Sequence, residues 1–187
     1  MSGRCFAPYS PTSSEHSDGH LGRLPFPQQH PRLRRPTDDR VLERILDAGR
    51  RAPSAFNSQP WDFVVVTGHP ALDDLATVWQ GARHIARSAA TIAIITPIEP
   101  VADKARWAEF DLGQAVMAMA VIAADQGVAS AHALIGDQQR CRSLLGVPET
   151  HRGAYLLALG YPASGKLTPR DHLDRRPLAE VVHRGRW

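Results

Sequence analysis

A short polar segment between two apolar stretches carries the side chains best suited to bind a ligand. The segment runs from Arg50 to Phe63, and its candidate contacts follow one another closely: Pro53, Ser54, Ala55, Asn57, Ser58 and Gln59. Asn and Gln each offer a hydrogen-bond donor and an acceptor, which matches the alternating edge of a pyrimidine-dione ring. Turn chemistry explains the same residues, because Ser, Asn and Pro favour loops in any protein. The segment is therefore either a binding loop for a planar heterocycle or an ordinary turn.

Other motifs for chemistry are incomplete or missing from the sequence. Residues Gly160 to Leu167 approach the phosphate-loop pattern G-x-x-x-x-G-K-[ST], but Leu167 replaces the magnesium-binding hydroxyl, so a surface turn is expected there. No G-x-G-x-x-G, G-x-S-x-G or H-E-x-x-H occurs. The nine His do not cluster with acids or Cys at metal-ligand spacing. We expect neither a metal site nor a nucleophile paired with its base.

Apolar periodicity and turn residues predict the elements that position this loop. A first helix starts near Asp38 and is closed by Pro53, which keeps the residue before it out of helical conformation. Further helices are expected over Ala71–Trp79, Asp103–Gln126 and 137–145, and strands over Phe63–Thr67, Ala90–Thr96, Ala129–Ile135 and Ala154–Leu159, the first two of them buried. This alternation predicts an α/β or α+β domain with a central sheet covered on both faces.

The second half of the long helix, Ala115–Ala124, is apolar on every side. Such a helix has to be buried all round, either in a core or in a subunit interface. The run of ten residues is too short to span a bilayer. Gly127 is expected to end the helix.

The charge of the chain is concentrated at its N-terminus. The first 36 of the 187 residues hold five Arg, two acidic residues and six of the 15 Pro, so the whole net charge of +3 lies there. We interpret residues 1–36 as a flexible basic arm rich in Pro and Ser, and residues 37–187 as one domain. The neutral domain argues against a nucleic-acid-binding face. No signal peptide is visible, so a cytoplasmic location is expected, with no membrane partner.

An ordered set of motifs resembles the nitroreductase-like FMN oxidoreductases. It begins with A-P-S-x-x-N-x-Q-P-W-x-F-V-V-V at Ala52–Val66 and continues with Asp111-Leu-Gly-Gln-Ala and Gly127-Val-Ala-Ser. It ends with Leu145-Gly-Val-Pro-Glu, Leu159-Gly-Tyr-Pro and the tail from Arg175 to Trp187. The motifs follow the order and spacing of that family over roughly residues 40–187, and the ordered set is more specific than any one of them.

The resemblance implies an α+β fold, with a central mixed sheet flanked by helices, in an intertwined homodimer that holds one FMN in each of two interface sites. The apolar helix would be dimer core. Pro53, Ser54, Ala55 and Asn57 would reach the flavin bound mainly by the other subunit, with Gln59 similarly placed. The backbone of His132, Ala133, Leu134 and Ile135 would line the flavin ring, and Arg175 and Arg176 would bind its phosphate, for which the guanidinium fork is suited.

One part of the family pattern is displaced. Where the family has an N-terminal Arg cluster, this chain has Phe26–His30, which contains no Arg. Basic residues lie on either side of that stretch, at Arg23, Arg32, Arg34 and Arg35. Either a shifted Arg takes over this contact to the FMN phosphate, or the contact is missing.

The activity implied by the resemblance is ping-pong hydride transfer. NADH or NADPH would deliver a hydride to flavin N5, and an electron-poor small molecule, nitroaromatic or quinone-like, would then accept it. The flavin would carry the chemistry, so no catalytic side chain is expected, while Phe56 and Trp61 are candidates for a hydrophobic wall. Two alternatives stay open: a flavin-dependent dehydrogenase or oxidase in a biosynthetic pathway, and a flavin-binding protein with little turnover.

Overall fold

The computed structural model describes residues 38–162, 167 and 175–187. The predicted arm with its five Arg and most of the turn after Gly160 lie outside these residues. The elements run in the order α1 (Asp39–Arg50), η2 (Ala55–Asn57), β1 (Asp62–Thr67), α2 (His69–Leu75), η3 (Gln80–Ala82), η4 (Ile85–Arg87), β2 (Ala90–Pro97), α3 (Ala102–Asp125), β3 (Ala129–Leu134), α4 (Gln138–Leu145), β4 (His151–Gly160) and α5 (Leu178–Val181).

Local signals placed the ends of α1, α3 and α4 well, whereas the second helix, predicted over Ala71–Trp79, runs from His69 to Leu75 because the chain continues after it in turns. The side chain of Asp38 caps α1, and the side chain of Asp137 accepts a hydrogen bond from Arg140 N–H at the start of α4. Gly127 follows α3 with φ +71°, and Gly146 closes α4 with φ +67°. Glycine adopts this left-handed conformation without a steric penalty, so both helices end where the sequence predicts.

Four strands form one sheet in the order β1-β2-β4-β3, and all three pairings are antiparallel. The prediction of a mixed sheet is therefore wrong for the described strands. The long helix α3 carries the chain back from the end of β2 to the start of β3, so these two strands run in the same direction. They are not neighbours, because β4 lies between them and pairs with both.

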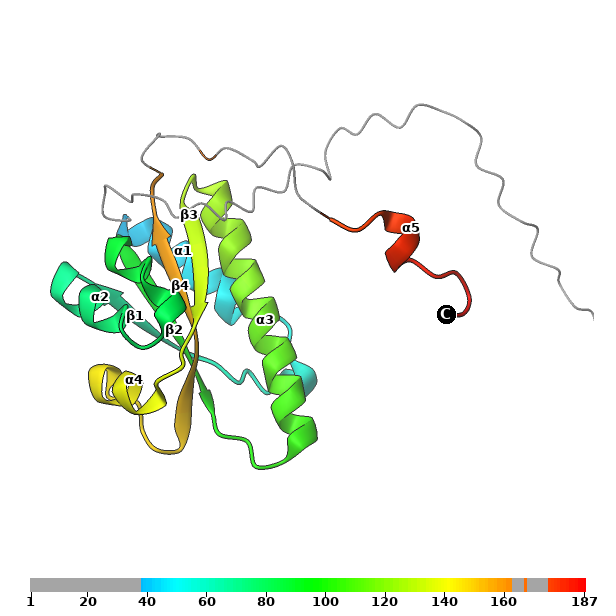
Figure 1. Ribbon diagram of the computed structural model, residues 1–187, viewed down its shortest axis with the longest axis horizontal. Coiled ribbons are helices and arrows are strands. Elements are labelled where there is room, and N and C mark those ends of the chain that lie inside the picture. Colours follow the sequence, from blue (N-terminus) through cyan, green and yellow to red (C-terminus); the bar gives the residue numbers. More distant parts are fainter. Residues whose placement is uncertain (1–37, 163–166, 168–174) are drawn as a thin grey trace, which may run out of the picture.

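Two hydrophobic clusters fill the two faces of the sheet, and Figure 1 shows helices on both sides of it. The first, which we call the α2/α4 core, packs α2, the 3₁₀ turns and α4 against one face. The second, the α1/α3 core, packs α1 and α3 against the other. As expected, β2 is buried along its length. The expectation that β1 is buried is wrong, because β1 is an edge strand and only Val66 within it is buried.

Helix α3 is buried on one side only. Ala115, Met119 and Ala123 belong to the α1/α3 core, whereas Met117 and Val121 are 48% and 44% exposed. Among the described residues the apolar helix is therefore not buried all round. Among the described helices α3 alone has the length and composition to cross a membrane, which says little because core helices share both properties.

Candidate functional site

The predicted binding loop has an unusual backbone. Three of its residues other than Gly have positive φ: Phe56 at 53°, Asn57 at 55° and Gln59 at 48°. Left-handed conformations are uncommon for residues with a Cβ and cluster at functional sites. Here they turn the chain sharply between α1 and β1, in the segment where the sequence places the ligand contacts.

Hydrogen bonds within the loop maintain this shape. The Ser54 Oγ accepts the N–H of Gln59 at 3.0 Å, and the Ser54 carbonyl accepts the N–H of Asn57 at 3.0 Å. The Gln59 carbonyl accepts the N–H of Trp61 at 2.8 Å, and the Gln59 side-chain amide donates to the Asn57 carbonyl at 3.3 Å. The segment is thus an ordered turn, and its Ser54 hydroxyl hydrogen remains available to donate.

Helix α3 anchors the loop from the side. The buried carboxylate of Asp111 accepts the N–H of Ala55 at 2.9 Å. The amide of Gln114 lies 3.4 Å from the Pro53 carbonyl oxygen and 3.4 Å from Asp111 Oδ1. The sequence analysis noted Asp111 and Gln114 only as part of a motif. No spacing rule connects them with a loop more than 50 positions earlier, so only the structure reveals the contact.

The loop presents an aromatic and a polar side chain to its surroundings. Phe56 is 90% exposed, and its ring lies against that of Trp107, with centroids 5.5 Å apart. The Asn57 side chain is also exposed. Phe56 can therefore serve as the predicted hydrophobic wall. Trp61 is wrong for that role, because it is buried in the α1/α3 core.

The second predicted group lies on the edge strand β3. Ala133 is buried in the α2/α4 core, and alternation along the strand turns His132 and Leu134 toward the opposite face. Both are exposed there, since β3 lies at the edge of the sheet. Ile135, just beyond the strand, is buried with Ala133. This stretch offers an open backbone and an exposed Leu134 rather than a closed pocket.

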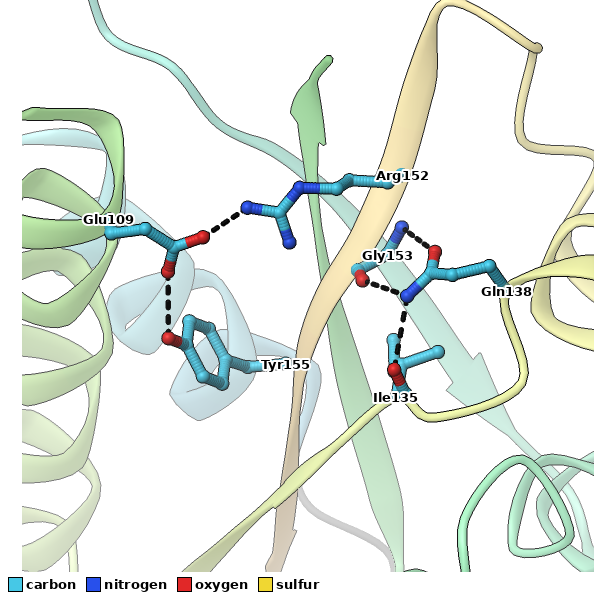
Figure 2. A network of polar contacts seen from close by, with 6 residues as sticks. All are labelled: Glu109, Ile135, Gln138, Arg152, Gly153 and Tyr155. Atoms are coloured by element: carbon cyan, nitrogen blue, oxygen red, sulfur yellow. Dashed lines mark hydrogen bonds and ion pairs between the residues drawn. The ribbon is translucent and has the colours of Figure 1, made fainter. Parts of the chain in front are cut away.

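Polar contacts link α3 to β4, the strand that pairs with β3 (Figure 2). Glu109 on α3 forms an ion pair with Arg152 and accepts a hydrogen bond from the Tyr155 hydroxyl at 2.8 Å. Tyr155 is the register partner of Leu134. Burial and the hydrogen bond to Glu109 raise the pKa of Tyr155 above its usual value of 10.0. The phenol thus keeps its proton at neutral pH.

Figure 2 also shows a connection on the α4 side. The amide of Gln138 donates to the carbonyls of Ile135 and Gly153, and its oxygen accepts the N–H of Gly153. This side chain takes the place of a strand residue where β3 ends, so it serves the fold. Near α2, a surface hollow of about 370 Å³ lined partly by Trp79 and Arg83 contains none of the predicted site residues.

The tail holds the third predicted group. Arg175 and Arg176 precede the short helix α5, which lies apart from the sheet in Figure 1. Arg176 donates to the Glu180 carbonyl at 2.7 Å, and its Nε lies 3.7 Å from the Glu180 carboxylate. Its side chain is largely exposed.

The structure does not bring the three groups together within one chain. The loop contacts α3 through Asp111 and Gln114, whereas the described contacts near β3 run through Glu109 and Tyr155. Across the described ranges, no hydrogen bond, ion pair or ring contact that we find joins the loop, His132–Leu134 and Arg176. The predicted residues therefore lie in separate parts of the described chain. In the same ranges, no group of three or more His, Cys, Asp or Glu could hold a metal ion.

Comparisons with known sequences agree with the motif set. The family model described as "Nitroreductase family" matches residues 33–94, which include the loop. A candidate NADH dehydrogenase/NAD(P)H nitroreductase from Archaeoglobus fulgidus is 28% identical over 160 residues, covering 82% of this chain and 89% of that protein. An NADH dehydrogenase from Thermus thermophilus is 26% identical over 183 residues, covering 79% of this chain and 86% of that one.

Comparisons with solved structures give the same fold. An FMN-dependent nitroreductase from Clostridium difficile superposes with a TM-score of 0.73, at 21% identity over 88% of this chain and 98% of that one. A candidate nitroreductase from Desulfovibrio desulfuricans, solved in complex with FMN, has a TM-score of 0.63 at 26% identity, covering 82% of this chain and 91% of that one.

Proposed function

Because the chain is nitroreductase-like in both sequence and fold, we propose that it is an FMN-dependent oxidoreductase. The proposed reaction passes a hydride from NADH or NADPH to an electron-poor acceptor, either a nitroaromatic or a quinone-like molecule. The observation that carries the proposal is the ordered Pro53–Gln59 loop, whose residues match the family motif and present polar groups from a strained backbone.

The donor set of the loop fits a flavin. The exposed Asn57 amide supplies a donor and an acceptor, and the Ser54 hydroxyl can donate while it accepts the Gln59 N–H. These groups match the polar edge of a pyrimidine-dione ring. Arg175 and Arg176 supply guanidinium groups for a phosphate dianion. When bound, FMN would supply the redox chemistry, and the protein would bind and orient the reactants.

We infer that the site is completed by a second copy of the chain. The outward side of α3 exposes Phe110, Met117 and Val121, the first of them 71% exposed. An apolar stripe of this kind on a helix is expected to be covered. The loop and the β3 segment lie apart within one chain. In a homodimer, the loop of one chain and the β3 segment of the other could contact the same FMN.

The first test is the visible spectrum of the full-length protein after reconstitution with FMN. We expect bound flavin, bleaching of its absorbance by NADPH or NADH, and steady-state reduction of menadione or a nitroarene. A protein that retains no flavin would overturn the proposal. Flavin binding without turnover would indicate a flavin-binding protein, and oxygen consumption without nicotinamide would indicate a dehydrogenase or oxidase.

The tail provides a matched pair of variants for the same test. Removing both guanidinium groups in Arg175→Gln/Arg176→Gln should weaken FMN binding by about tenfold or more, because each charge-assisted phosphate contact contributes to affinity. Arg184→Gln/Arg186→Gln removes the same charge from the same tail and should leave the affinity unchanged. Equal losses in both variants would show a general charge effect and contradict the assigned phosphate contact.

A further inference from the structure

We propose that Asp111 is a positioning residue that holds the Pro53–Gln59 loop in its FMN-binding shape. The inference rests on the proposed function, since it assigns a role in that same site. It concerns a residue that contacts the loop backbone and that we do not place against the flavin.

The position of Asp111 is unusual for a carboxylate. It is 2% exposed and lies on the packed side of α3, beside Leu112 and Ala115 of the α1/α3 core. In the part of the chain that the structure describes, no cation forms an ion pair with it. A buried carboxylate is costly unless hydrogen bonds satisfy it, and an apolar residue would fill the same space without that cost. The carboxylate accepts two hydrogen bonds, from the Ala55 N–H at 2.9 Å and from the Gln114 amide at 3.4 Å, and the shorter of them reaches the loop.

That N–H belongs to the residue where the loop begins to turn. Ala55 is the first residue of η2, and the N–H groups at the start of a helical turn have no partner within the turn. Ser54 occupies the N-cap position, but its side chain makes no capping hydrogen bond. Its hydroxyl instead accepts the N–H of Gln59 and closes the far end of the loop. Asp111 thus acts as an N-cap supplied by another element, more than 50 residues away.

The three left-handed residues explain why the loop needs this anchor. Phe56, Asn57 and Gln59 hold positive φ values that residues with a Cβ avoid when they are free. Such conformations persist only where the surroundings over-determine them. The loop is held at Ala55 by Asp111, near Pro53 by Gln114, and across its far end by Ser54. Between these points lie Phe56 and Asn57, which are both exposed.

The experiment uses the full-length protein and two measurements. Hydrogen–deuterium exchange of peptides covering residues 53–61 reports the loop without any ligand, and fluorescence titration reports the Kd for FMN. In Asp111→Ala we expect faster exchange in the loop and a Kd for FMN raised about tenfold or more. In Asp111→Asn the side-chain oxygen can still accept the Ala55 N–H, so we expect slow exchange and a Kd within about threefold of wild type.

A second variant removes the donor instead of the acceptor. Ala55→Pro lacks the N–H, and proline suits the first position of a helical turn that follows an extended residue such as Ser54, with φ −143° and ψ 152°. It should reproduce the faster exchange and weaker FMN binding of Asp111→Ala. This variant tests the contact even if Asp111→Ala does not fold.

A destabilised control separates positioning from general loss of stability. Leu75→Ala, in the α2/α4 core, should lower the Tm without altering loop exchange or the Kd for FMN. The inference is overturned if both alanine variants raise the Kd equally, if Asp111→Ala leaves exchange and Kd at wild-type values, or if Asp111→Asn is as damaging as Asp111→Ala. A wild-type protein that binds no FMN would overturn the proposed function, and loop exchange would still decide whether Asp111 holds the loop.

Discussion

The two faces of the sheet differ in how completely one chain covers them. The α2/α4 core is closed by α2, the 3₁₀ turns and α4, which pack directly on the sheet. On the other face α3 packs with its inner side, and its outer side exposes Phe110, Met117 and Val121. In the described part of the chain, one face is covered by the chain itself and is here called the finished face, whereas the outer side of α3 is uncovered and makes the other the open face. The anchored loop lies against the helix of the open face, where a second chain could complete a site.

The polar contacts differ in the same way. Near the α2/α4 core, Gln138 bonds to the backbone of both Ile135 and Gly153 and extends the pairing of β3 with β4. On the α3 side, Glu109 binds Arg152 and Tyr155, and Asp111 binds the loop. The first contact maintains the sheet, whereas the contacts made by α3 position groups around the open face. Under the proposed function, the first face stabilises the fold and the second carries the site.

The largest effect is expected from a cavity in the finished face. Leu75 is 1% exposed, so Leu75→Ala should lower the free energy of unfolding by about 2–5 kcal/mol. Urea denaturation measures this loss. If the α2/α4 core belongs to each chain alone, the loss should be the same in a variant that cannot dimerise. A loss confined to the dimer would contradict the comparison of the two faces.

An intermediate effect is expected from a charge on the open face. In Met117→Glu the carboxylate would be buried in the proposed dimer interface. The dimer Kd should therefore rise about tenfold or more, which is a loss of about 1.4 kcal/mol in the free energy of association. Analytical ultracentrifugation would show the shift from two chains to one. Leu144→Glu is the matched control, because Leu144 is an exposed apolar residue of α4 on the finished face. Equal behaviour of the two variants would exclude α3 as the interface.

The smallest effect is a pH dependence on the α3 side. The pKa of Tyr155 is raised in the folded chain, so above pH 10.0 the unfolded chain loses the phenol proton first. The contribution of Tyr155 to the free energy of unfolding is complete below that pH, and it is lost as the pH rises through the pKa of Tyr155 in the folded chain. Tyr155→Phe should cost about 1 kcal/mol at neutral pH and give a shallower fall in stability at alkaline pH. Tyr161→Phe is the matched control, and identical alkaline profiles for wild type and Tyr155→Phe would contradict the assignment.

Much of the fold could be predicted from the sequence, and the site residues stay a prediction. The periodic apolar residues predicted β2 and the long helix α3 within a residue or two of their ends. The polar loop was predicted from residue types alone, because Pro, Ser, Asn and Gln are typical of both turns and polar surfaces. The burial of β1 was wrong, since a β-branched run looks the same at the edge of a sheet as in its centre. The prediction that Trp61 forms a hydrophobic wall was also wrong, because Trp61 is buried. Whether a residue is exposed depends on neighbours from distant segments of the chain.

By itself the sequence determined the ends of α1, α3 and α4, because capping residues, glycine and proline act on a few neighbouring residues, whereas the predicted bounds of α2 and β4 were wrong by up to four residues. It also determined the family resemblance, which lies in motifs that can be compared position by position. Only the tertiary structure decided that β4 lies between β2 and β3, that Asp111 reaches Ala55, and that one side of α3 is left open. These features involve residues far apart in the chain, and their stability depends on which surfaces pack against each other in the folded protein.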